Sequence, residues 1–185
     1  MIDLRVKHIG EDLADMQRAN QLQNRPTLYL ETTVPSYYVA RPSTDMIILT
    51  HQHITQEWWD TQLQDYEAFV SEVVYDEILR GDADASRRRL EVIKGFPTLD
   101  VTDEAAELAQ IYLNELPLPR TALADALHLA VASINGMDYL LTWNCRHIAR
   151  GSVKRLLPAV NAGRGLLSPT ICTPEELMYE DQDLD

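Results

Sequence analysis

The sequence predicts an α/β protein, a three-layer α/β/α sandwich built on a mainly parallel sheet. Short apolar runs that suit buried strands alternate along the chain with longer segments of helical periodicity. Prolines and glycines separate these segments, and capping residues precede several of the helical ones. The chain has 185 residues, of which 45% are hydrophobic, so it is large enough to bury the core of one domain.

Five short apolar segments are the expected strands. Each is too short for a typical helix and is followed by a turn or by a helix signal. They are residues 27–30, 66–70, 99–101, 139–142 and, as an edge strand, 169–173.

Helices are expected between the strands, whereas residues 32–35 are expected to form only a turn. Ser71 and Thr102 are suitable N-caps, and Gly81 and Gly136 are suitable stops. The expected helices lie within residues 44–63, from Ser71 to Gly81, at 84–94, after Thr102, at 122–134 and at 153–161.

The expected domain spans residues 27–178. Residues 1–26 form a polar N-terminal extension with a possible short helix at 11–20, and residues 179–185 form an acidic tail. The longest apolar runs fall far short of the ~18 residues of a membrane span, and no secretory signal is visible. Cys145 and Cys172 form no CxxC pair, so reduced thiols and a cytoplasmic location are expected.

The charge is unevenly distributed along the chain. The formal net charge is −13, yet residues 145–165 contain five basic residues and no acid. Such a segment can hold a polyanion locally, although it can equally be a solvated helix face. Arg146, Arg150 and Lys154 would line one face if the helix ran unbroken through Gly151, and they are the candidate residues to hold a polyanion.

Four acidic or amide residues are the candidate catalytic residues. Glu31 and Asn144 follow expected strands, whereas Glu77 and Asp125 lie on helices. The carboxyl ends of parallel strands meet at one crevice, where ligands bind. Gathered carboxylates repel each other, and a hard divalent cation such as Mg²⁺ or Mn²⁺ relieves that repulsion. The sequence therefore predicts a metal-dependent hydrolase that acts on phosphate esters.

Each candidate also has a purely structural interpretation. Glu31 could be an exposed acid in a turn, and Glu77 could form a surface salt bridge with Arg80. Asp125 could cap its otherwise apolar helix, and Asn144 could cap the following segment. His128, one turn after Asp125, is expected to be a hydrogen-bonded core histidine.

Three hydroxyls are expected to support this site. Thr32 and Thr33 directly follow Glu31, and Thr142 ends the fourth strand near Asn144. The chain contains no GxxxxGK[ST], GxGxxG, GxSxG or HExxH motif, which excludes the usual P-loop, dinucleotide, serine-hydrolase and zincin patterns.

Four segments in order resemble PIN-domain proteins, and among them the VapC-like toxins of type II toxin–antitoxin systems. The segments are residues 28–36, 71–82, 124–130 and 139–145. The resemblance implies a PIN fold, a Mg²⁺- or Mn²⁺-dependent ribonuclease active on single-stranded RNA, a cognate antitoxin and a homodimer. By matching position, it implies that Glu31, Glu77 and Asp125 are the metal ligands, and the RNA-binding residues would then be Arg146, Arg150 and Lys154. The chain departs from the family pattern at Glu31, where Asp is commoner, and at Asn144, where many members carry an acid.

Two other function classes are compatible with parts of this sequence. A PIN-like module that binds RNA or protein with weak or no nuclease activity would explain the two departures. A phosphatase of the haloacid-dehalogenase type is disfavoured, because its chemistry requires an Asp nucleophile after the first strand and a second acid two residues later, where this chain has Glu31 and Thr33.

Overall fold

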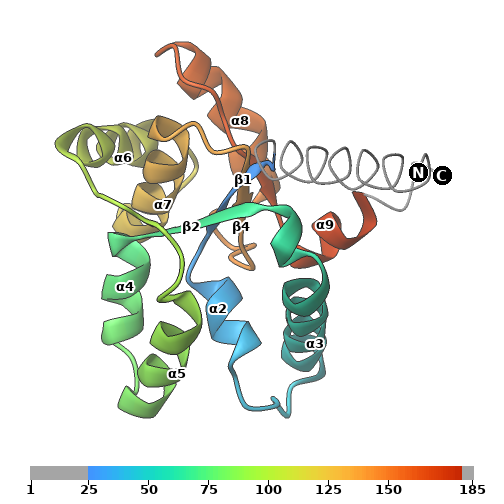
Figure 1. The fold of residues 1–185 in the computed structure, drawn as a ribbon. Helices are drawn as coiled ribbons and strands as arrows, with labels where there is room; N and C mark the ends of the chain where they lie inside the picture. Colours follow the sequence, from blue (N-terminus) through green and yellow to red (C-terminus); the bar gives the residue numbers. More distant parts are fainter. Residues whose placement is uncertain (1–24, 181–185) are drawn as a thin grey trace, which may run out of the picture.

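The computed structural model describes residues 25–180 and contains a parallel sheet covered by helices on both sides (Figure 1). The strands are β1 (Thr27–Leu30), β2 (Glu67–Ser71), β3 (Thr98–Leu99), β4 (Tyr139–Leu141) and β5 (Thr170–Cys172). Their order is β3-β2-β1-β4-β5, and every pair is parallel. The predicted fold class is therefore confirmed.

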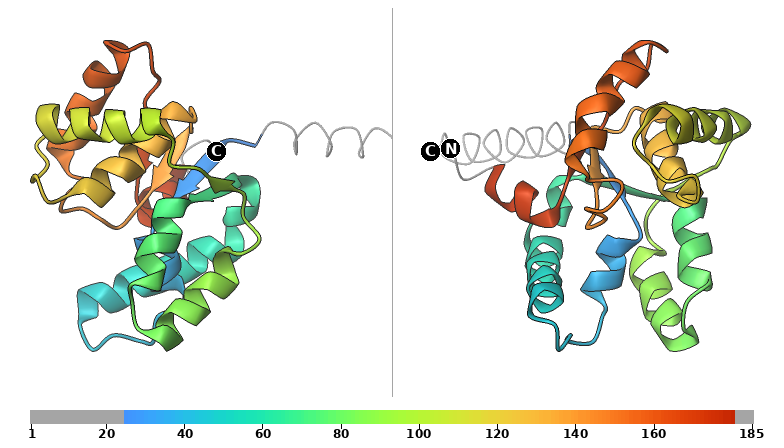
Figure 2. Two further views of the ribbon diagram at one scale, coloured as in Figure 1. Left: turned by 90° about the vertical axis from the view of Figure 1, so that its left-hand side faces the viewer. Right: turned by 180° about the vertical axis from the view of Figure 1, so that it is seen from behind.

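Eight α-helices and one 3₁₀ turn connect the strands within residues 25–180. They are α2 (Thr33–Tyr38), α3 (Met46–Thr61), η1 (Leu63–Asp65), α4 (Glu72–Leu79), α5 (Ala83–Ile93), α6 (Asp103–Glu115), α7 (Leu123–Ile134), α8 (Gly151–Ala162) and α9 (Pro174–Glu180). The helices α6 and α7 lie on one side of the sheet, whereas α3 and α9 lie on the other (Figures 1 and 2).

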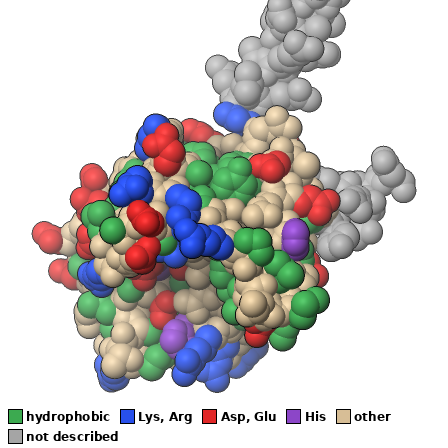
Figure 3. All heavy atoms as spheres, turned by 90° about the horizontal axis from the view of Figure 1, so that it is seen from below, with side chains coloured by type: hydrophobic (Ala, Val, Ile, Leu, Met, Phe, Trp, Pro, Cys, Tyr) green, Lys and Arg blue, Asp and Glu red, His purple; other side chains and the backbone are tan. Residues whose placement is uncertain are grey.

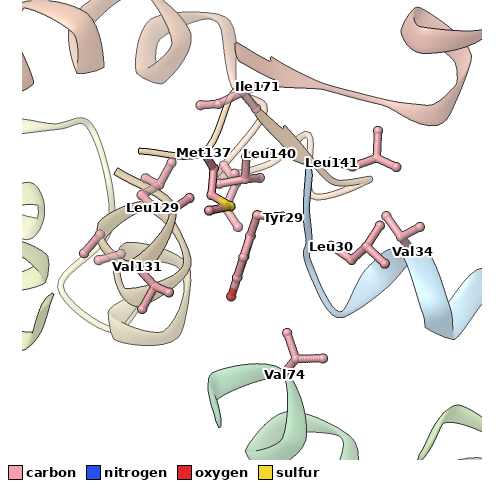
Figure 4. Packing of buried hydrophobic residues seen from close by; sticks show 14 of the residues in the cluster. Tyr29, Leu30, Val34, Val74, Leu129, Val131, Met137, Leu140, Leu141 and Ile171 are labelled. Atoms are coloured by element: carbon pink, nitrogen blue, oxygen red, sulfur yellow. The ribbon is translucent and has the colours of Figure 1, made fainter. Parts of the chain in front are cut away.

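The core lies between these layers, where the alternation along β1 sends successive side chains to opposite faces. Leu28, Tyr29 and Leu30 are fully buried. Tyr29 extends toward α7, while Leu30 lies on the side of Val34 (Figure 4). Because β1 occupies the middle of the sheet, the residues that follow it are also held in a buried environment.

Local sequence explains several helix ends. Asp45 caps α3 by accepting hydrogen bonds from the backbone N–H groups of Ile47 and Ile48, and Thr102 caps α6 as predicted. Gly136 ends α7 with a φ of 61°, a conformation that a residue without Cβ adopts at little cost.

Two helices were not predicted, and both begin with a proline in their first turn. Residues 32–35 were expected to turn the chain, yet α2 starts at Thr33 with Pro35 as its third residue. At the other end, Thr173-Pro174-Glu175-Glu176 is a capping box: Thr173 N–H donates to Glu176 Oε2 at 2.8 Å, and Glu176 N–H donates to Thr173 Oγ1 at 3.2 Å.

The expected domain bounds remain a prediction at both ends. The extension 1–26, with its short helix at 11–20, lies outside the described residues except for its last two. The first two residues of the expected acidic tail 179–185 belong to α9, and the rest lie outside the described range. No helix among the described residues is both long and apolar enough to cross a membrane.

Candidate active site

The candidate site lies at the carboxyl edge of β1, β2 and β4. From β1 the chain passes to β2 on one side, and it later returns to β4 on the other side of β1. Such a reversal opens a crevice at the strand ends, which is where α/β proteins bind ligands. Glu31 leaves β1 at this edge, and its backbone N–H still donates to the Leu141 carbonyl of β4 at 3.1 Å.

Glu31 is 3% exposed and is held through one of its two carboxylate oxygens. Its Oε2 accepts hydrogen bonds from Thr33 N–H at 3.1 Å, from Thr33 Oγ1 at 2.5 Å and from Thr142 Oγ1 at 2.7 Å. Its Oε1 accepts no hydrogen bond from any residue within 25–180. Burial raises the pKa of Glu31, although the charge of His128 and the hydroxyls of Thr33 and Thr142 act in the opposite direction.

Glu77 projects from α4 toward His128 rather than toward Arg80. His128 Nε2 lies 3.1 Å from Glu77 Oε2, while Arg80 pairs weakly with Asp76 at 3.9 Å. Burial acts to raise the pKa of Glu77, but the hydrogen bond and charge of His128, with help from Thr32 and Arg80, lower it overall. The surface salt bridge with Arg80 is thus not the role of Glu77 in this fold.

His128 is fully buried and is hydrogen-bonded at both ring nitrogens, as expected for a core histidine. Its Nδ1 lies 2.7 Å from the Tyr29 hydroxyl, which lies 2.6 Å from the Ser71 hydroxyl. Ser71 stands at the N-cap position of α4, but its side chain makes no capping hydrogen bond. The predicted capping role of Ser71 is therefore wrong, because its hydroxyl bonds Tyr29 instead.

Glu31, Glu77 and His128 converge. One ligand atom from each lies within 4.8 Å of the others, which is close enough for a single metal ion to contact all three. Carboxylates and imidazole are common metal ligands in proteins, and Glu31 Oε1 accepts no hydrogen bond from the part of the chain that the structure describes. The residues present at this edge therefore fit a divalent cation.

Asp125 and Asn144 form a second cluster beside the first. Asn144 Nδ2 donates to Asp125 Oδ1 at 2.6 Å, and His147 Nδ1 lies 2.7 Å from Asp125 Oδ2. Asn144 Oδ1 also accepts from the His147 backbone N–H at 3.1 Å, as the capping interpretation expects. Asp125 makes no capping bond, because α7 begins at Leu123 without a side-chain cap. Asp125 does not join the group formed by Glu31, Glu77 and His128.

Thr142 connects the two clusters. Its hydroxyl donates to Glu31 and accepts from the Asn144 backbone N–H at 2.9 Å. Thr33 similarly donates to Glu31 while accepting from the Trp143 backbone N–H at 2.8 Å. The hydroxyls of Thr33 and Thr142, which were predicted to support the site, therefore connect Glu31 to the segment that carries Asn144, the hydrogen-bond partner of Asp125.

The three basic residues do not share one helix face. The helix α8 begins only at Gly151, so Arg146 lies in the preceding turns and Arg150 occupies the N-cap position. The expectation of an unbroken basic face is thus wrong, because the polypeptide turns after Asn144 instead of continuing as a helix. Lys154 forms an ion pair with Glu176 at 3.0 Å, and Arg150 contacts the Pro117 carbonyl at 3.4 Å. Arg146 is exposed and forms no hydrogen bond or ion pair with residues 25–180.

A cleft of about 490 Å³ opens beside Glu77, between α4 and α7. Acidic side chains line the α4 wall, and apolar side chains line the α7 wall; the lining includes Glu72, Asp76, Glu77, Leu123 and Leu127. Figure 3 looks onto this edge of the molecule, where acidic, basic and histidine side chains surround a hollow in the surface.

Sequence reasoning missed two site residues, both histidines. His128 was expected only to fill the core, and His147 was not singled out. The spacing Asp125-x-x-His128 places both side chains on one face of a helix, and Asn144-x-x-His147 spans a single turn. These spacings are the signals that could have identified both residues.

The chain is similar to known proteins in sequence pattern and in fold. A family model described as "PIN domain" matches residues 29–150. A toxin–antitoxin complex from Klebsiella pneumoniae is similar in structure, with a TM-score of 0.52 and 16% identity over 80% of this chain and 98% of that one. VapBC2 from Rickettsia felis, solved with a DNA fragment from the promoter, gives a TM-score of 0.50 and 12% identity over the same shares. No curated protein sequence matches.

At these identities the two solved structures show a shared fold. The family match covers about two thirds of the chain, from β1 to the turn before α8, and so includes every residue of both clusters. The resemblance inferred from the four sequence segments is confirmed, and the chain belongs to the PIN-domain family.

Proposed function

We propose that this protein is a metal-dependent endoribonuclease that hydrolyses phosphodiester bonds in single-stranded RNA. The observation that carries the proposal is the buried carboxylate of Glu31, set within 4.8 Å of ligand atoms of Glu77 and His128 at the sheet's switch point. Buried carboxylates repel each other and are expensive to ionise, so a site of this kind is suited to a cation.

Each residue of the site would have a distinct role in this reaction. Glu31 and Glu77 would hold Mg²⁺ or Mn²⁺ together with Asp125 from the neighbouring cluster. Thr33 and Thr142 would keep Glu31 in place, and Asn144 would keep Asp125 in place, through the hydrogen bonds described above. The bound cation would lower the pKa of the attacking water and stabilise the leaving oxygen. Arg146 has no partner within residues 25–180 and is free to contact the RNA backbone, with Arg150 beside it.

Single substitutions at the three acids test the activity. Glu31→Gln, Glu77→Gln and Asp125→Ala should each reduce cleavage of a fluorescent single-stranded RNA by about 10²–10³-fold, as expected when a preorganised charged group is removed. Asp76→Asn is the matched control, because Asp76 precedes Glu77 on α4 but its side chain is 69% exposed. Circular dichroism verifies folding. Cleavage that is unchanged in a folded Asp125→Ala variant would falsify the assignment of Asp125.

A toxin role, an antitoxin partner and a homodimer belong to the same proposal. The two similar solved structures are described as a toxin–antitoxin complex and as VapBC2. The cleft between α4 and α7 has an apolar wall that could accept an amphipathic partner helix. Growth arrest on expression, relieved by an antitoxin encoded beside the gene, would support this role, and a cytoplasmic location is expected with it.

The arrangement around Asp125 favours one alternative. Both oxygens of Asp125 are occupied by Asn144 and His147, and Asn144 contributes no charge. A PIN-like module that binds RNA or protein without cleaving RNA is therefore the second candidate. Calorimetry distinguishes the two, because the alternative predicts no Mg²⁺ or Mn²⁺ binding at millimolar concentration.

A further inference from the structure

The metal-competent group contains a nitrogen donor. Of its three members, His128 is the most deeply placed: its side chain is 0% exposed, whereas that of Glu77 is 29% exposed. Any polar neighbour could supply the hydrogen bonds that a buried histidine on the inner face of α7 requires. Here its Nε2 lies 3.1 Å from the Glu77 carboxylate, in one group with Glu31, and its Nδ1 lies 2.7 Å from the Tyr29 hydroxyl.

The hydrogen bonds behind His128 can run in either direction. When Nε2 carries the proton, it donates to Glu77, and Nδ1 accepts from the Tyr29 hydroxyl, which accepts from Ser71. When Nδ1 carries the proton, it donates to Tyr29 Oη, and the Tyr29 hydroxyl donates to Ser71 Oγ. The second arrangement leaves the Nε2 lone pair on the side of the Glu77 carboxylate, with the histidine still neutral.

This second arrangement is the usual environment of a metal-bound histidine, whose other ring nitrogen donates to a fixed acceptor. In this protein the acceptor is the Tyr29 hydroxyl, which is in turn bonded to Ser71. Ser71 stands at the N-cap position of α4 but makes no capping hydrogen bond, so α4 lacks the stabilisation that a side-chain cap would give. Tyr29 and Ser71 are both fully buried, so the relay is rigid.

We infer that His128 is a nitrogen ligand of the cation, held by Tyr29 and Ser71, and that the site therefore selects Mn²⁺ over Mg²⁺. Imidazole is a ligand of first-row transition ions, of which Mn²⁺ binds most weakly, whereas Mg²⁺ takes oxygen ligands and water. This inference rests on the proposed function only in using the same cation site. RNA hydrolysis at an all-oxygen Mg²⁺ site would leave the proposed function standing without it.

Electron spin-echo spectroscopy of the Mn²⁺-loaded full-length protein tests the ligand directly. We expect ¹⁴N modulation from a coordinated imidazole in the wild type, its loss in His128→Gln, and its retention in His147→Gln. Because His128 is buried and H128Q could fail to fold, a second variant lacks the other four of the five histidines, H8Q/H51Q/H53Q/H147Q. Modulation that persists in this variant assigns the nitrogen to His128, and its absence there overturns the inference.

Calorimetric titration with Mn²⁺ and Mg²⁺ tests the selectivity and the relay. Tyr29→Phe should weaken Mn²⁺ binding by about 10–100-fold, the range typical of removing the partner of a metal-bound histidine. Tyr112→Phe is the matched control, because Tyr112 is another buried tyrosine with two hydrogen-bond partners, Ser133 and Asn161, away from the site. Equal losses in the two variants, or equal wild-type affinities for Mn²⁺ and Mg²⁺, would contradict the inference.

The outcomes separate the two hypotheses. Mn²⁺ bound without ¹⁴N modulation, together with RNA cleavage, sinks the role of His128 and leaves the ribonuclease proposal intact. Nitrogen-coordinated Mn²⁺ without RNA cleavage supports the role of His128 and contradicts the ribonuclease proposal.

Discussion

Among the acidic residues within 25–180, Glu31 is the most deeply buried. It is 3% exposed, and three hydrogen bonds stabilise its Oε2. These bonds favour the carboxylate, but burial outweighs them and raises the pKa of Glu31 above its usual 4.5. The fold therefore accepts an unfavourable charge at this position, which a cation would relieve.

The stability of the metal-free protein should reflect this charge. Since the pKa of Glu31 is raised on folding, the unfolded chain releases its proton first, and Glu31 destabilises the fold increasingly as the pH rises above 4.5. We expect Glu31→Gln to raise the melting temperature at pH 7 by a few degrees, since about 1 kcal/mol moves it by roughly 2–4 °C at this size. Thermal denaturation in EDTA measures the change.

Two comparisons complete that test. At a pH below 4.5 the difference between wild type and Glu31→Gln should shrink, because Glu31 is then protonated in both states. Added Mn²⁺ should stabilise the wild type and not the variant. A Glu31→Gln variant that melts below the wild type at pH 7 without metal would show that the three hydrogen bonds outweigh burial.

At the residue scale, the sequence was enough to select most residues of the site. It was not enough to predict which residues each of them contacts. Glu31, Thr33, Thr142 and Asn144 could be chosen because they follow apolar strands. The partners of His128 could not, because they come from β1, β2 and α4, which are distant in the chain.

At the scale of elements, α9 shows how a short helix is attached to the domain. Its capping box closes on itself through Thr173 and Glu176, and the same Glu176 accepts from Lys154 Nζ of α8 at 3.0 and 3.1 Å. Burial acts to raise the pKa of Glu176, but the Thr173 N–H and Lys154 lower it overall.

The attachment of α9 should weaken in acid. A carboxylate whose pKa is lowered on folding contributes stability above its unfolded value, and this contribution is lost as the pH falls below 4.5. Glu176→Gln should reduce the free energy of unfolding at pH 7 by less than about 1 kcal/mol, because the side chain is 54% exposed and solvent screens the pair. Urea denaturation from neutral pH to well below 4.5 measures this loss, which should vanish in acid.

The neighbouring residue provides the control for α9. Glu175→Gln removes the same charge from the same turn, but Glu175 is exposed and caps nothing. A loss in Glu176→Gln that equals that of Glu175→Gln, or that persists in acid, would mean that the Lys154 pair and the capping box contribute no stability.

Helices could be predicted where the hydrophobic period extended over several turns. The helices α3, α5, α6 and α7 and all five strands lie within a few residues of their expected positions. The helix α2 was not predicted because its six residues are too few to show a helical period. The helix α9 has seven residues, and its only strong sequence signal is the capping box at its start. The break before α8 was missed because Asn144 and His147 stabilise a turn that spacing alone does not reveal.

For the whole molecule, charge distribution determines how RNA could approach. The net charge of −13 opposes a polyanion, so binding must depend on a few local cations. Of the three predicted RNA-binding residues, Lys154 is already paired with Glu176, which leaves Arg146 and Arg150 nearest to Asn144.

Arg146→Ala combined with Arg150→Ala should therefore weaken RNA binding and its salt dependence together. For single strands, every phosphate that the protein no longer neutralises reduces the slope of log K against log salt by about 0.7. Fluorescence anisotropy with the Glu77→Gln background, which prevents cleavage, measures both quantities. Arg155→Ala is the control, because Arg155 is exposed on α8 beyond these residues. An equal effect of Arg155→Ala would indicate diffuse attraction rather than a defined path.

The amino-acid sequence by itself determined the class of fold, the sheet edge where the acids gather and the family, because strand and helix periods and the residues at strand ends are local properties. Only the tertiary structure decided that Glu31 meets Glu77 and His128, while Asp125 meets Asn144 and His147. Those contacts depend on the order β3-β2-β1-β4-β5 and on where α4 and α7 pack across the strand ends, and long-range packing leaves no periodic trace in the chain.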